Sequence, residues 1–421
     1  MANIHSNELF KHFYAHLSEW SRTGTEPAEA DQDTQYFLDS QEKRLKAKGI
    51  TIERTYEPFK GVPSGTYHNN KHDKGGFVRT INYQPLEEEL SFIKDQKKIF
   101  TQKRNIIMYA SIMYPRAGEE EIGDTARVCP NCGAATKIAD LIGNGCPYCR
   151  TKYIIDDLFP KVTNYFTINH FDQPHKIKQK SKTYSLVGGI TFAILGVLLG
   201  LVTMNASSPT EIIFSILRVL FLAVPIGFFG ALLGYILYSI SLLFGLFKNL
   251  GDSLSRIDVL GSDKKLDQNL LQYDPSFSSH YFADRVSTLF HMVAFSDNPE
   301  KLAQYHGAPL NHKYRDLVLS ENRGGISVKS IRREGDQIIA DLGLYVTNYY
   351  LVGDKIQRRD ECVQIKLRHG TEFHVDENFS VLAVKCEHCG GSFRADYDKH
   401  CKWCHQECDF AKRDWIIESI N

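Results

Sequence analysis

An excess of charge of either sign is missing from this chain. Its 421 residues contain 50 Lys and Arg residues and 50 Asp and Glu residues, so the formal net charge is zero. A balanced chain has no global field that attracts nucleic acid or anionic lipid. The N-terminus also lacks a basic stretch followed by an apolar one, and we therefore expect no cleavable signal peptide. The length fits roughly two or three domains.

Sequence motifs of several enzyme classes are also missing. The chain has no His-Glu-x-x-His pair and no Gly-rich phosphate-binding loop. The string 251–255 (Gly-Asp-Ser-Leu-Ser) is similar to the nucleophile block of GDSL-type esterases, but no Asp-x-x-His follows Ser253. A helix end at Gly251, followed by the cap of the next helix, explains this string better. We therefore predict that the protein is not an enzyme.

The cysteines are used unevenly, because eight of the ten fall into two quartets of the form Cys-x-x-Cys … Cys-x-x-Cys. The quartets consist of Cys129, Cys132, Cys146 and Cys149, then of Cys386, Cys389, Cys401 and Cys404. Each Cys-x-x-Cys turns two thiolates towards one point, and two such turns complete a tetrahedral zinc shell. We therefore predict two structural zinc ions in closed sites, and a reducing compartment.

The sequence around the first quartet, with Gly133 after the first pair, resembles zinc ribbons of the transcription factor TFIIB type, and we place this ribbon at residues 126–160. Ribbons also occur in nucleic-acid binders. Here acidic residues offset the basic ones: Lys137, Arg150 and Lys152 against Asp140, Asp156 and Asp157, then Arg394, Lys399 and Lys402 against Glu387, Asp396 and Asp398. Neither set forms a basic stripe, so we do not expect nucleic acid as a partner.

Four further residues near the second quartet could act as alternative metal ligands. They are Cys408, His388, His400 and His405. The sequence leaves this alternative open. The remaining thiol, Cys362, lies in a predicted strand and is interpreted as a core or half-exposed residue.

Two long apolar stretches lie between the quartets. No charged residue occurs from Thr183 to Thr210, and the run Leu186–Met204 is 19 residues long. A second charge-free run, Val219–Phe247, follows a polar break. Because a helix needs about 20 apolar residues to cross a bilayer, we predict a two-helix transmembrane hairpin over residues 183–247.

The flanks of the apolar stretches predict their orientation. Basic residues lie before the first stretch and after the second, but not in the connecting loop: Lys176, Lys178, Lys180, Lys182, Lys248 and Arg256. The positive-inside rule then places both termini in the cytoplasm of a multi-pass cell-membrane protein. No ionisable residue lies at mid-depth, which favours an anchor over a transporter. Pairs of glycines four apart, Gly196 with Gly200 and Gly230 with Gly234, allow close helix packing.

The C-terminal third predicts an α+β fold. A helix opens near Asp274, and its apolar residues recur on one face. Alternating apolar residues then predict a strand meander with turns at Gly335 and Gly353. The final strands, Val381–Val384 and Trp415–Ile417, are expected to pair as a hairpin that carries the second ribbon at its tip. Helices followed by such a meander favour an antiparallel sheet with helices packed on one face. We expect Phe282, Leu289 and Phe290 to pack against Leu342, Leu344 and Val346.

The opening residues of this region resemble the Tim-forty-four-like domain of bacterial membrane proteins and of a mitochondrial import subunit. The matching positions are Asp274, Pro275, Phe277, Ser278, Phe282, Arg285 and Val286, with a closing match at 414–420. The resemblance implies a cone-shaped fold like that of nuclear transport factor two over residues 264–421, with the second zinc ribbon inserted at 385–410. It also implies a docking role at the membrane.

The N-terminal region, residues 1–125, gives a weaker pattern and is predicted to be mostly helical and cytoplasmic. An amphipathic face at Phe10–Trp20, a segment at Gln35–Lys48 and another at Glu87–Phe100 are helix candidates, and Lys60–Gly76 is expected to be a polar loop. Apolar and acidic residues after each quartet, at Tyr153 and Trp415, suggest a loose internal repeat.

These observations favour a membrane-anchored zinc-ribbon protein whose C-terminal domain docks a protein or lipid partner. Two alternatives stay open. One is an enzyme that uses the cavity of the cone, for which Asp341 is the carboxylate in the longest predicted strand. The other is a nucleic-acid-linked membrane regulator, which would need a basic patch across both ribbons.

Overall fold

The structure is a computed structural model that divides into two compact units. It describes residues 2–59, 63–68, 76–116, 122–169, 174–202, 213, 217, 219–241, 262–273, 277–371, 383–386, 388–394, 399–408, 410–412 and 414–421. Unit 1 comprises Met1–His170 together with Asp258–Asn421, and unit 2 comprises Phe171–Ile257. The regions predicted at 1–125, 126–160 and 264–421 therefore belong to one compact unit. The fold is a mixture of helices and antiparallel sheets, as predicted.

The first part of unit 1, residues 2–169 (the N half), contains a five-stranded antiparallel sheet with the strand order β1-β3-β4-β7 and with β2 paired to β3. Its main elements are α1 (Ala2–Thr23), α2 (Gln32–Ala47), β1 (Ile50–Pro58), β2 (Gly65–His68), β3 (Phe77–Lys94), β4 (Lys97–Pro115) and β7 (Lys161–Asn169). The predicted helix face is confirmed, because Phe10, Phe13, Leu17 and Trp20 are all buried in the same core.

The prediction that residues 1–125 are mostly helical is wrong. The segment Glu87–Phe100 lies in the β3–β4 hairpin, which is paired along its length. Leu90 and Phe92 are buried at alternate positions, but so is Glu88. A carboxylate at an inward position hides the period-two pattern by which a strand is recognised. Within the expected loop 60–76, Gly65–His68 is strand β2, and residues 60–62 and 69–75 lie outside the described residues.

The second part of unit 1, residues 262–421 (the C half), contains a four-stranded antiparallel sheet with the order β13-β10-β9-β8. Its elements are α8 (Ser262–Leu270), α9 (Ser279–Phe295), the short 3-10 helices η2 (Pro299–Lys301) and η3 (His312–Arg315), β8 (Leu317–Glu334), β9 (Gln337–Val352), β10 (Lys355–Gly370) and β13 (Ile416–Ile420). Gly335 and Gly353 take positive φ at the predicted turns.

The predicted helix and its packing are confirmed. The Ser278 side chain caps α9 by accepting a hydrogen bond from the Tyr281 backbone N–H. The predicted core residues of α9 and β9 share one buried cluster: Phe282, Leu289, Phe290, Leu342, Leu344 and Val346. The expected pairing of Val381–Val384 with Trp415–Ile417 is wrong. Ala383–Lys385 forms β11, which pairs with β12 (Ser392–Arg394), whereas β13 pairs with β10.

Apart from the extra strand β2, the two halves have the same topology. In each, helices lead to a three-strand meander, a cysteine quartet follows, and a fourth strand returns to pair with the third. In each, the fourth strand begins twelve residues after the last cysteine. In both halves, the second residue of this fourth strand makes the same two backbone hydrogen bonds to a preceding loop. The Val162 N–H donates to the Glu29 carbonyl, and the Val162 carbonyl accepts from the Asp31 N–H. The Ile417 N–H donates to the Gln304 carbonyl, and the Ile417 carbonyl accepts from the His306 N–H. The halves therefore repeat each other, but the expected match of Tyr153 with Trp415 is wrong, because Pro160 occupies the place of Trp415.

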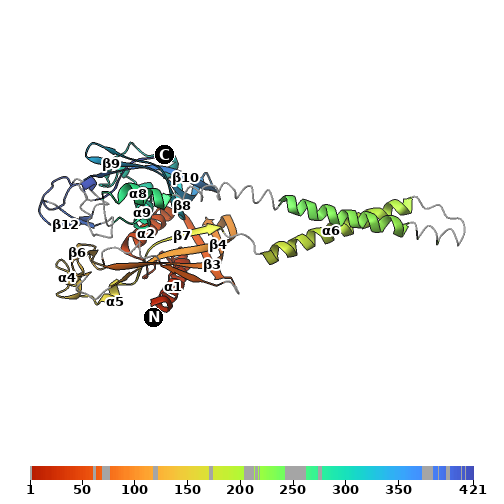
Figure 1. Ribbon diagram of the computed structural model, residues 1–421, viewed down its shortest axis with the longest axis horizontal. Helices are drawn as coiled ribbons and strands as arrows, with labels where there is room; N and C mark the ends of the chain where they lie inside the picture. Colours follow the sequence, from red (N-terminus) through yellow and green to blue (C-terminus); the bar gives the residue numbers. More distant parts are fainter. Residues whose placement is uncertain are drawn as a thin grey trace. The chain divides into compact units, whose positions relative to one another are not determined.

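Helices α2 and α9 lie between the two sheets in Figure 1 and connect the halves. The buried guanidinium of Arg44 on α2 donates to the carbonyls of Phe295 and Tyr314, both at 2.9 Å. The amide oxygen of Gln41 accepts from the Ser320 backbone N–H at 2.8 Å. These bonds satisfy backbone groups of the C half with side chains of the N half, and both sheets belong to one compact unit.

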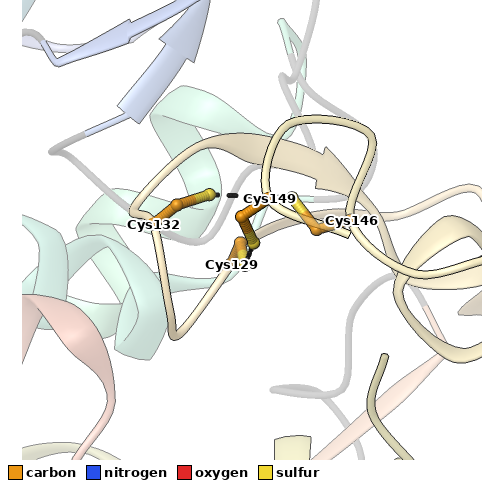
Figure 2. A group of neighbouring side chains, drawn as sticks. All are labelled: Cys129, Cys132, Cys146 and Cys149. Atoms are coloured by element: carbon orange, nitrogen blue, oxygen red, sulfur yellow. Dashed lines mark hydrogen bonds between the residues drawn. The ribbon is translucent and has the colours of Figure 1, made fainter. Parts of the chain in front are cut away.

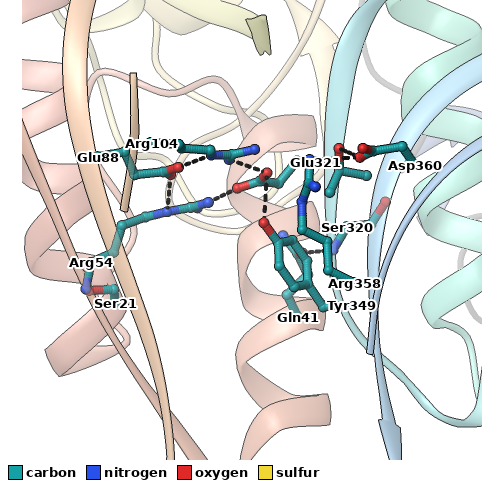
Figure 3. A network of polar contacts seen from close by, with 11 residues as sticks. Ser21, Gln41, Arg54, Glu88, Arg104, Ser320, Glu321, Tyr349, Arg358 and Asp360 are labelled. Carbon is teal, nitrogen blue, oxygen red and sulfur yellow. Dashed lines mark hydrogen bonds and ion pairs between the residues drawn. The ribbon is translucent and has the colours of Figure 1, made fainter. Parts of the chain in front are cut away.

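A buried ionic network also joins the halves (Figure 3). Arg54 on β1 and Arg104 on β4 each pair with Glu88 on β3 and with Glu321 on β8. The phenol of Tyr349 donates to Glu321 at 3.3 Å. Two cations and two carboxylates balance in charge, and the Arg54, Glu88 and Glu321 side chains are buried. Three of these four charges come from the N half and one from the C half.

Unit 2 is a pair of apolar helices. Helix α6 (Pro174–Val202) contains the span Ser181–Leu199, and a second helix covers Val219–Ser241; both are long and apolar enough to cross a membrane. Only 6% and 22% of the two spans are buried, unlike the core helices of a soluble protein. Residues 203–212, which include the predicted polar break, and residues 242–257 lie outside the described residues.

Glycines allow the two apolar helices to approach closely. A Cβ added at Gly230 would lie 2.5 Å from the Gly188 carbonyl oxygen, and one at Gly234 would lie 2.3 Å from the Tyr184 carbonyl oxygen. On the first helix, a Cβ at Gly196 would lie 2.8 Å from the Ala223 Cα. Backbones this close are typical of small-residue packing between membrane helices.

Candidate metal centres

The four cysteines of the first quartet converge on one point (Figure 2). The Sγ atoms of Cys129 and Cys149 are 3.6 Å apart, and those of Cys132 and Cys146 are also 3.6 Å apart. All four sulfur atoms lie within 4.8 Å of one another. Two come from the segment after β5 (Ala126–Val128) and two from the loop after α4 (Ile138–Ile142).

The second quartet has the same arrangement. Its first and fourth cysteines, Cys386 and Cys404, have Sγ atoms 3.5 Å apart. Its second and third, Cys389 and Cys401, are 3.7 Å apart. In both quartets the first cysteine therefore lies next to the fourth and the second next to the third. The two sites are built on one plan.

The backbone explains why each Cys-x-x-Cys turns back on itself. We call each Cys-x-x-Cys segment a knuckle. In all four knuckles, the residue after the second cysteine has a positive φ and donates its backbone N–H to the carbonyl of the first cysteine. These residues are Gly133 (71°), Arg150 (62°), Gly390 (69°) and His405 (57°). Glycine adopts this conformation without strain, and the sequence provides it in the first knuckle of each quartet. In the second knuckles Arg150 and His405 adopt it despite their side chains.

The sulfur spacing fits a tetrahedral metal ion. Zn–S bonds of about 2.3 Å in tetrahedral geometry place sulfur atoms roughly 3.8 Å apart. The thiols differ in their proton affinity, since burial raises the pKa of Cys132 to about 12 and hydrogen bonding with Thr151 lowers the pKa of Cys149 to about 6. Four sulfurs this close cannot all ionise without a compensating cation. Binding of a divalent ion would therefore release protons from the quartet.

Each ribbon is fastened to its half. Ribbon 1, residues 126–158, contains β5, β6 (Ala135–Lys137), α4 and α5 (Ile155–Leu158). Its apolar cluster includes Phe77 of β3 and Met113 of β4. The Gln32 side chain of α2 also donates to the Cys129 carbonyl at 3.1 Å. Ribbon 2, residues 383–412, contains β11, β12 and η4 (Phe410–Lys412) and packs on Ala303 and Ile416.

The two ribbons also contact each other, which the sequence did not predict. The Ala135 backbone N–H of ribbon 1 donates to the Ser392 hydroxyl of ribbon 2 at 2.8 Å. The Ser392 backbone N–H donates to the Tyr148 hydroxyl of ribbon 1 at 3.2 Å. Nothing in the cysteine spacing signals this contact, because it depends on how the two halves pack.

The other candidate residues are not ligands in this arrangement. Among the described residues, the ligand groups contain only the eight cysteines and not Cys408, His388, His400 or His405. Cys362 is exposed on β10. Asp341, considered as a catalytic group, pairs with Arg332 and accepts from the Ser330 hydroxyl at 2.7 Å. Burial raises its pKa, but these contacts outweigh burial and hold the pKa below its usual value. Ser253 lies outside the described residues.

The comparisons with known proteins give no relative for this arrangement. No protein-family model, no curated protein and no solved structure matches the chain.

Proposed function

We propose that this protein is a membrane-anchored zinc-ribbon protein whose unit 1 docks a protein partner at the inner surface of the cell membrane. One observation carries the proposal: a unit with two convergent cysteine quartets is continuous in sequence, at both ends of unit 2, with a pair of apolar helices of membrane length. Such a chain combines a rigid presenting surface with an anchor.

Zinc is the metal that suits the quartets best. Four thiolates in tetrahedral geometry are the usual ligands of structural zinc, and they leave no position for water or substrate. We infer one zinc ion in each quartet, with a structural role. A closed site does not support metal-assisted catalysis, and the ion pair of Asp341 with Arg332 does not support a free catalytic carboxylate.

Two residues that carry the resemblance to the Tim-forty-four-like domain support the proposal. Arg285, from the opening motif, forms an ion pair with Asp414, from the closing one, so residues far apart in the sequence meet. The helix-on-sheet arrangement of the C half is compatible with the cone-shaped fold that the resemblance implies. That fold would provide a docking domain close to the bilayer.

The orientation can be tested by cysteine labelling with a membrane-impermeant maleimide in intact cells. We expect Ser207→Cys, in the connecting segment outside the described residues, to be labelled. Ser181→Cys, at the start of the first span, should be labelled only after permeabilisation. The unaltered chain is the matched control, because its own cysteines would all lie inside. The reverse pattern would refute the topology.

The docking role can be tested by in-cell photo-crosslinking from exposed positions of unit 1 in the full chain. We expect one protein to be captured repeatedly from neighbouring positions. A crosslinker at Phe221, exposed on the second apolar helix, is the control and should capture lipid. If unit 1 positions captured lipid and no protein, the proposed partner class would be wrong.

A further inference from the structure

Each ribbon exposes one aromatic side chain at the same position. Tyr148 is the third residue of the second Cys-x-x-Cys in ribbon 1, and Trp403 is the third residue of the second Cys-x-x-Cys in ribbon 2. Their exposed fractions are 46% and 57%. Single exposed apolar residues are ordinary on protein surfaces. Here, however, the two repeats expose aromatic rings at equivalent positions.

The two aromatic residues meet at one point of the ribbon–ribbon contact. The Tyr148 hydroxyl accepts from the Ser392 N–H at 3.2 Å, and the Trp403 indole N–H donates to the Ser392 carbonyl at 2.9 Å. A Cβ at Gly391 would lie 2.5 Å from Trp403 Cδ1, so the ring rests against the backbone there. The polar atoms of both aromatics are thus bonded, while large parts of the residues stay exposed.

Fixed aromatic side chains are suited to binding. Tyr and Trp supply a large contact area at low entropic cost, and they are enriched at the centres of protein interfaces. Hydrogen bonds that hold the rings before a partner arrives reduce the ordering cost of association. Because Tyr148 comes from ribbon 1 and Ser392 and Trp403 come from ribbon 2, the surface is complete only when both ribbons are folded.

Cationic residues lie close in the sequence to both aromatic residues. The Lys402 ammonium lies 4.8 Å from the centroid of the Trp403 ring. Arg150 and Lys152 are exposed just after Cys149. Within the described part of the chain, no ion pair is formed by any of these three cations. A surface of aromatic rings and unpaired cations is complementary to a ligand that carries both apolar side chains and carboxylates.

Within unit 1, the pair lies apart from the point at which strand β7 leads into unit 2. Strand β7 begins at Lys161, after ribbon 1, and ends at Asn169, where the chain continues towards unit 2. Its nine residues separate these points by roughly 26 Å at about 3.3 Å per residue. In Figure 1 the ribbons lie at the end of unit 1 away from the end of β7.

We propose that Tyr148 and Trp403 form a composite docking platform for a short acidic segment of a partner protein, with apolar side chains between its carboxylates. The inference rests on the proposed docking function and names its surface and the chemistry of its partner. The apolar side chains of the segment contact the two rings, and its carboxylates contact Lys402 and Arg150.

The test is a binding measurement with the full chain in lipid nanodiscs. The probe is a fluorescein-labelled short peptide of alternating Asp and Leu, followed by fluorescence anisotropy, with empty nanodiscs as the blank. We expect Trp403→Ala to weaken binding about tenfold, as for an interface hot spot, and Tyr148→Ala to weaken it several-fold. Lys402→Glu should also weaken binding, whereas a Lys/Leu peptide should not bind. Tyr67→Ala is the matched control, because Tyr67 is 54% exposed but lies on β2.

Folding defects are controlled by measuring the metal content of each variant and by Trp403→Phe, which keeps a ring and should bind better than Trp403→Ala. Equal affinity of Trp403→Ala, Tyr148→Ala and the unaltered chain, or no binding of the Asp/Leu peptide, would overturn the proposal. In-cell crosslinking separates this failure from that of the docking function. If a protein is captured from other positions of unit 1 but not from position 403, only the platform is refuted. If no position captures a protein, both the platform and the docking function are refuted.

Discussion

The N half and the C half of unit 1 share a topology but hold their ribbons differently. Ribbon 1 packs into an apolar cluster with Phe77 and Met113, which belong to the two longest strands of its sheet. Ribbon 2 packs on Ala303 and Ile416, at the margin of its sheet, and otherwise on its own Phe393 and Phe410. The same metal-binding module thus rests on two inner strands of the sheet in one half and on an edge strand in the other.

A second difference concerns charge. The N half supplies Arg54, Arg104 and Glu88 to the buried network, and the C half supplies only Glu321. The N-half core also includes residues of the C half, among them Leu319 and Tyr349. The halves are therefore repeats in topology without being independent in folding.

The largest expected effect comes from the metal sites. Cys129→Ser and Cys386→Ser alter equivalent, buried first cysteines. Each should lower the zinc content from two ions per chain to one, and structural zinc contributes apparent energies of about 10–16 kcal/mol in small ribbons. Because ribbon 1 packs on Phe77 of β3 and Met113 of β4, Cys129→Ser should also open the five-stranded sheet of the N half to protease. Cleavage in Cys386→Ser should stay within residues 383–412. Metal analysis and limited proteolysis measure both effects.

The control for the metal sites is Cys362→Ser, which alters an exposed thiol outside both quartets and should leave two ions bound. Equal and local cleavage in both ribbon variants would show that the ribbons are attached alike and would remove the first difference between the halves. A metal content near zero in chelator-free, reduced protein would refute zinc itself.

The next expected effect tests the ionic network between the halves. Glu321→Gln removes one of the two carboxylates, so that the two cations share Glu88 alone. Breaking a buried ion pair typically costs about 3–5 kcal/mol. Burial raises the pKa of Glu88, but Arg104 and Arg54 outweigh it and hold that pKa below its usual value. Thermal unfolding of the full chain should show the loss. Glu334→Gln, at an exposed pair with Arg332, is the control and should leave the midpoint unchanged.

A core substitution of similar size tests whether the halves unfold together. Phe290→Ala removes a fully buried ring of the C-half core and should cost about 3–5 kcal/mol through lost transfer energy and the cavity left behind. Phe13→Ala is the matched variant in the N-half core. Because the cores share strands and helices, each variant should shift one common transition. Two separate transitions would mean that the halves are independent domains.

The sequence predicted the parts of this molecule that depend on local spacing. Both quartets, the apolar helices, the helix after Ser278 and the turns at Gly335 and Gly353 follow from nearby residues. Strand β3 was not predicted, because Glu88 and Arg79 are buried at inward positions. Their charged partners lie on other strands or in the other half. Ribbon 2 was attached to the wrong strand because β13 pairs with β10 across a long insertion. The contact at Ser392 depends wholly on tertiary packing.

The smallest expected effect concerns pH and one buried carboxyl of the N half. Burial and the neighbouring charge of Asp33 raise the pKa of Asp31 to about 7, against the opposing effect of Arg127. Below its unfolded pKa the group is protonated in both states and costs nothing. As pH rises from the unfolded pKa to the folded pKa, the unfolded chain is ionised while the fold retains the proton, so stability falls. Asp31→Asn removes this loss and keeps the helix cap, since its amide oxygen can accept from the Thr34 N–H.

The measurement is the difference in unfolding free energy between Asp31→Asn and the unaltered chain across pH. Between about pH 5.5 and 7, the unfolding free energy of Asp31→Asn should rise by roughly 1–2 kcal/mol relative to that of the unaltered chain. His291 in the C half acts in the opposite sense, because burial lowers its pKa to about 3 and the fold loses stability as pH falls below the ordinary histidine value. Its contribution is the same in both proteins and cancels in the difference. Asp39→Asn on the same helix, in an i,i+4 pair with Lys43, should give a flat difference. A flat difference for Asp31→Asn as well would mean that Arg127 keeps Asp31 ionised, and the N half would then carry one more buried ion pair.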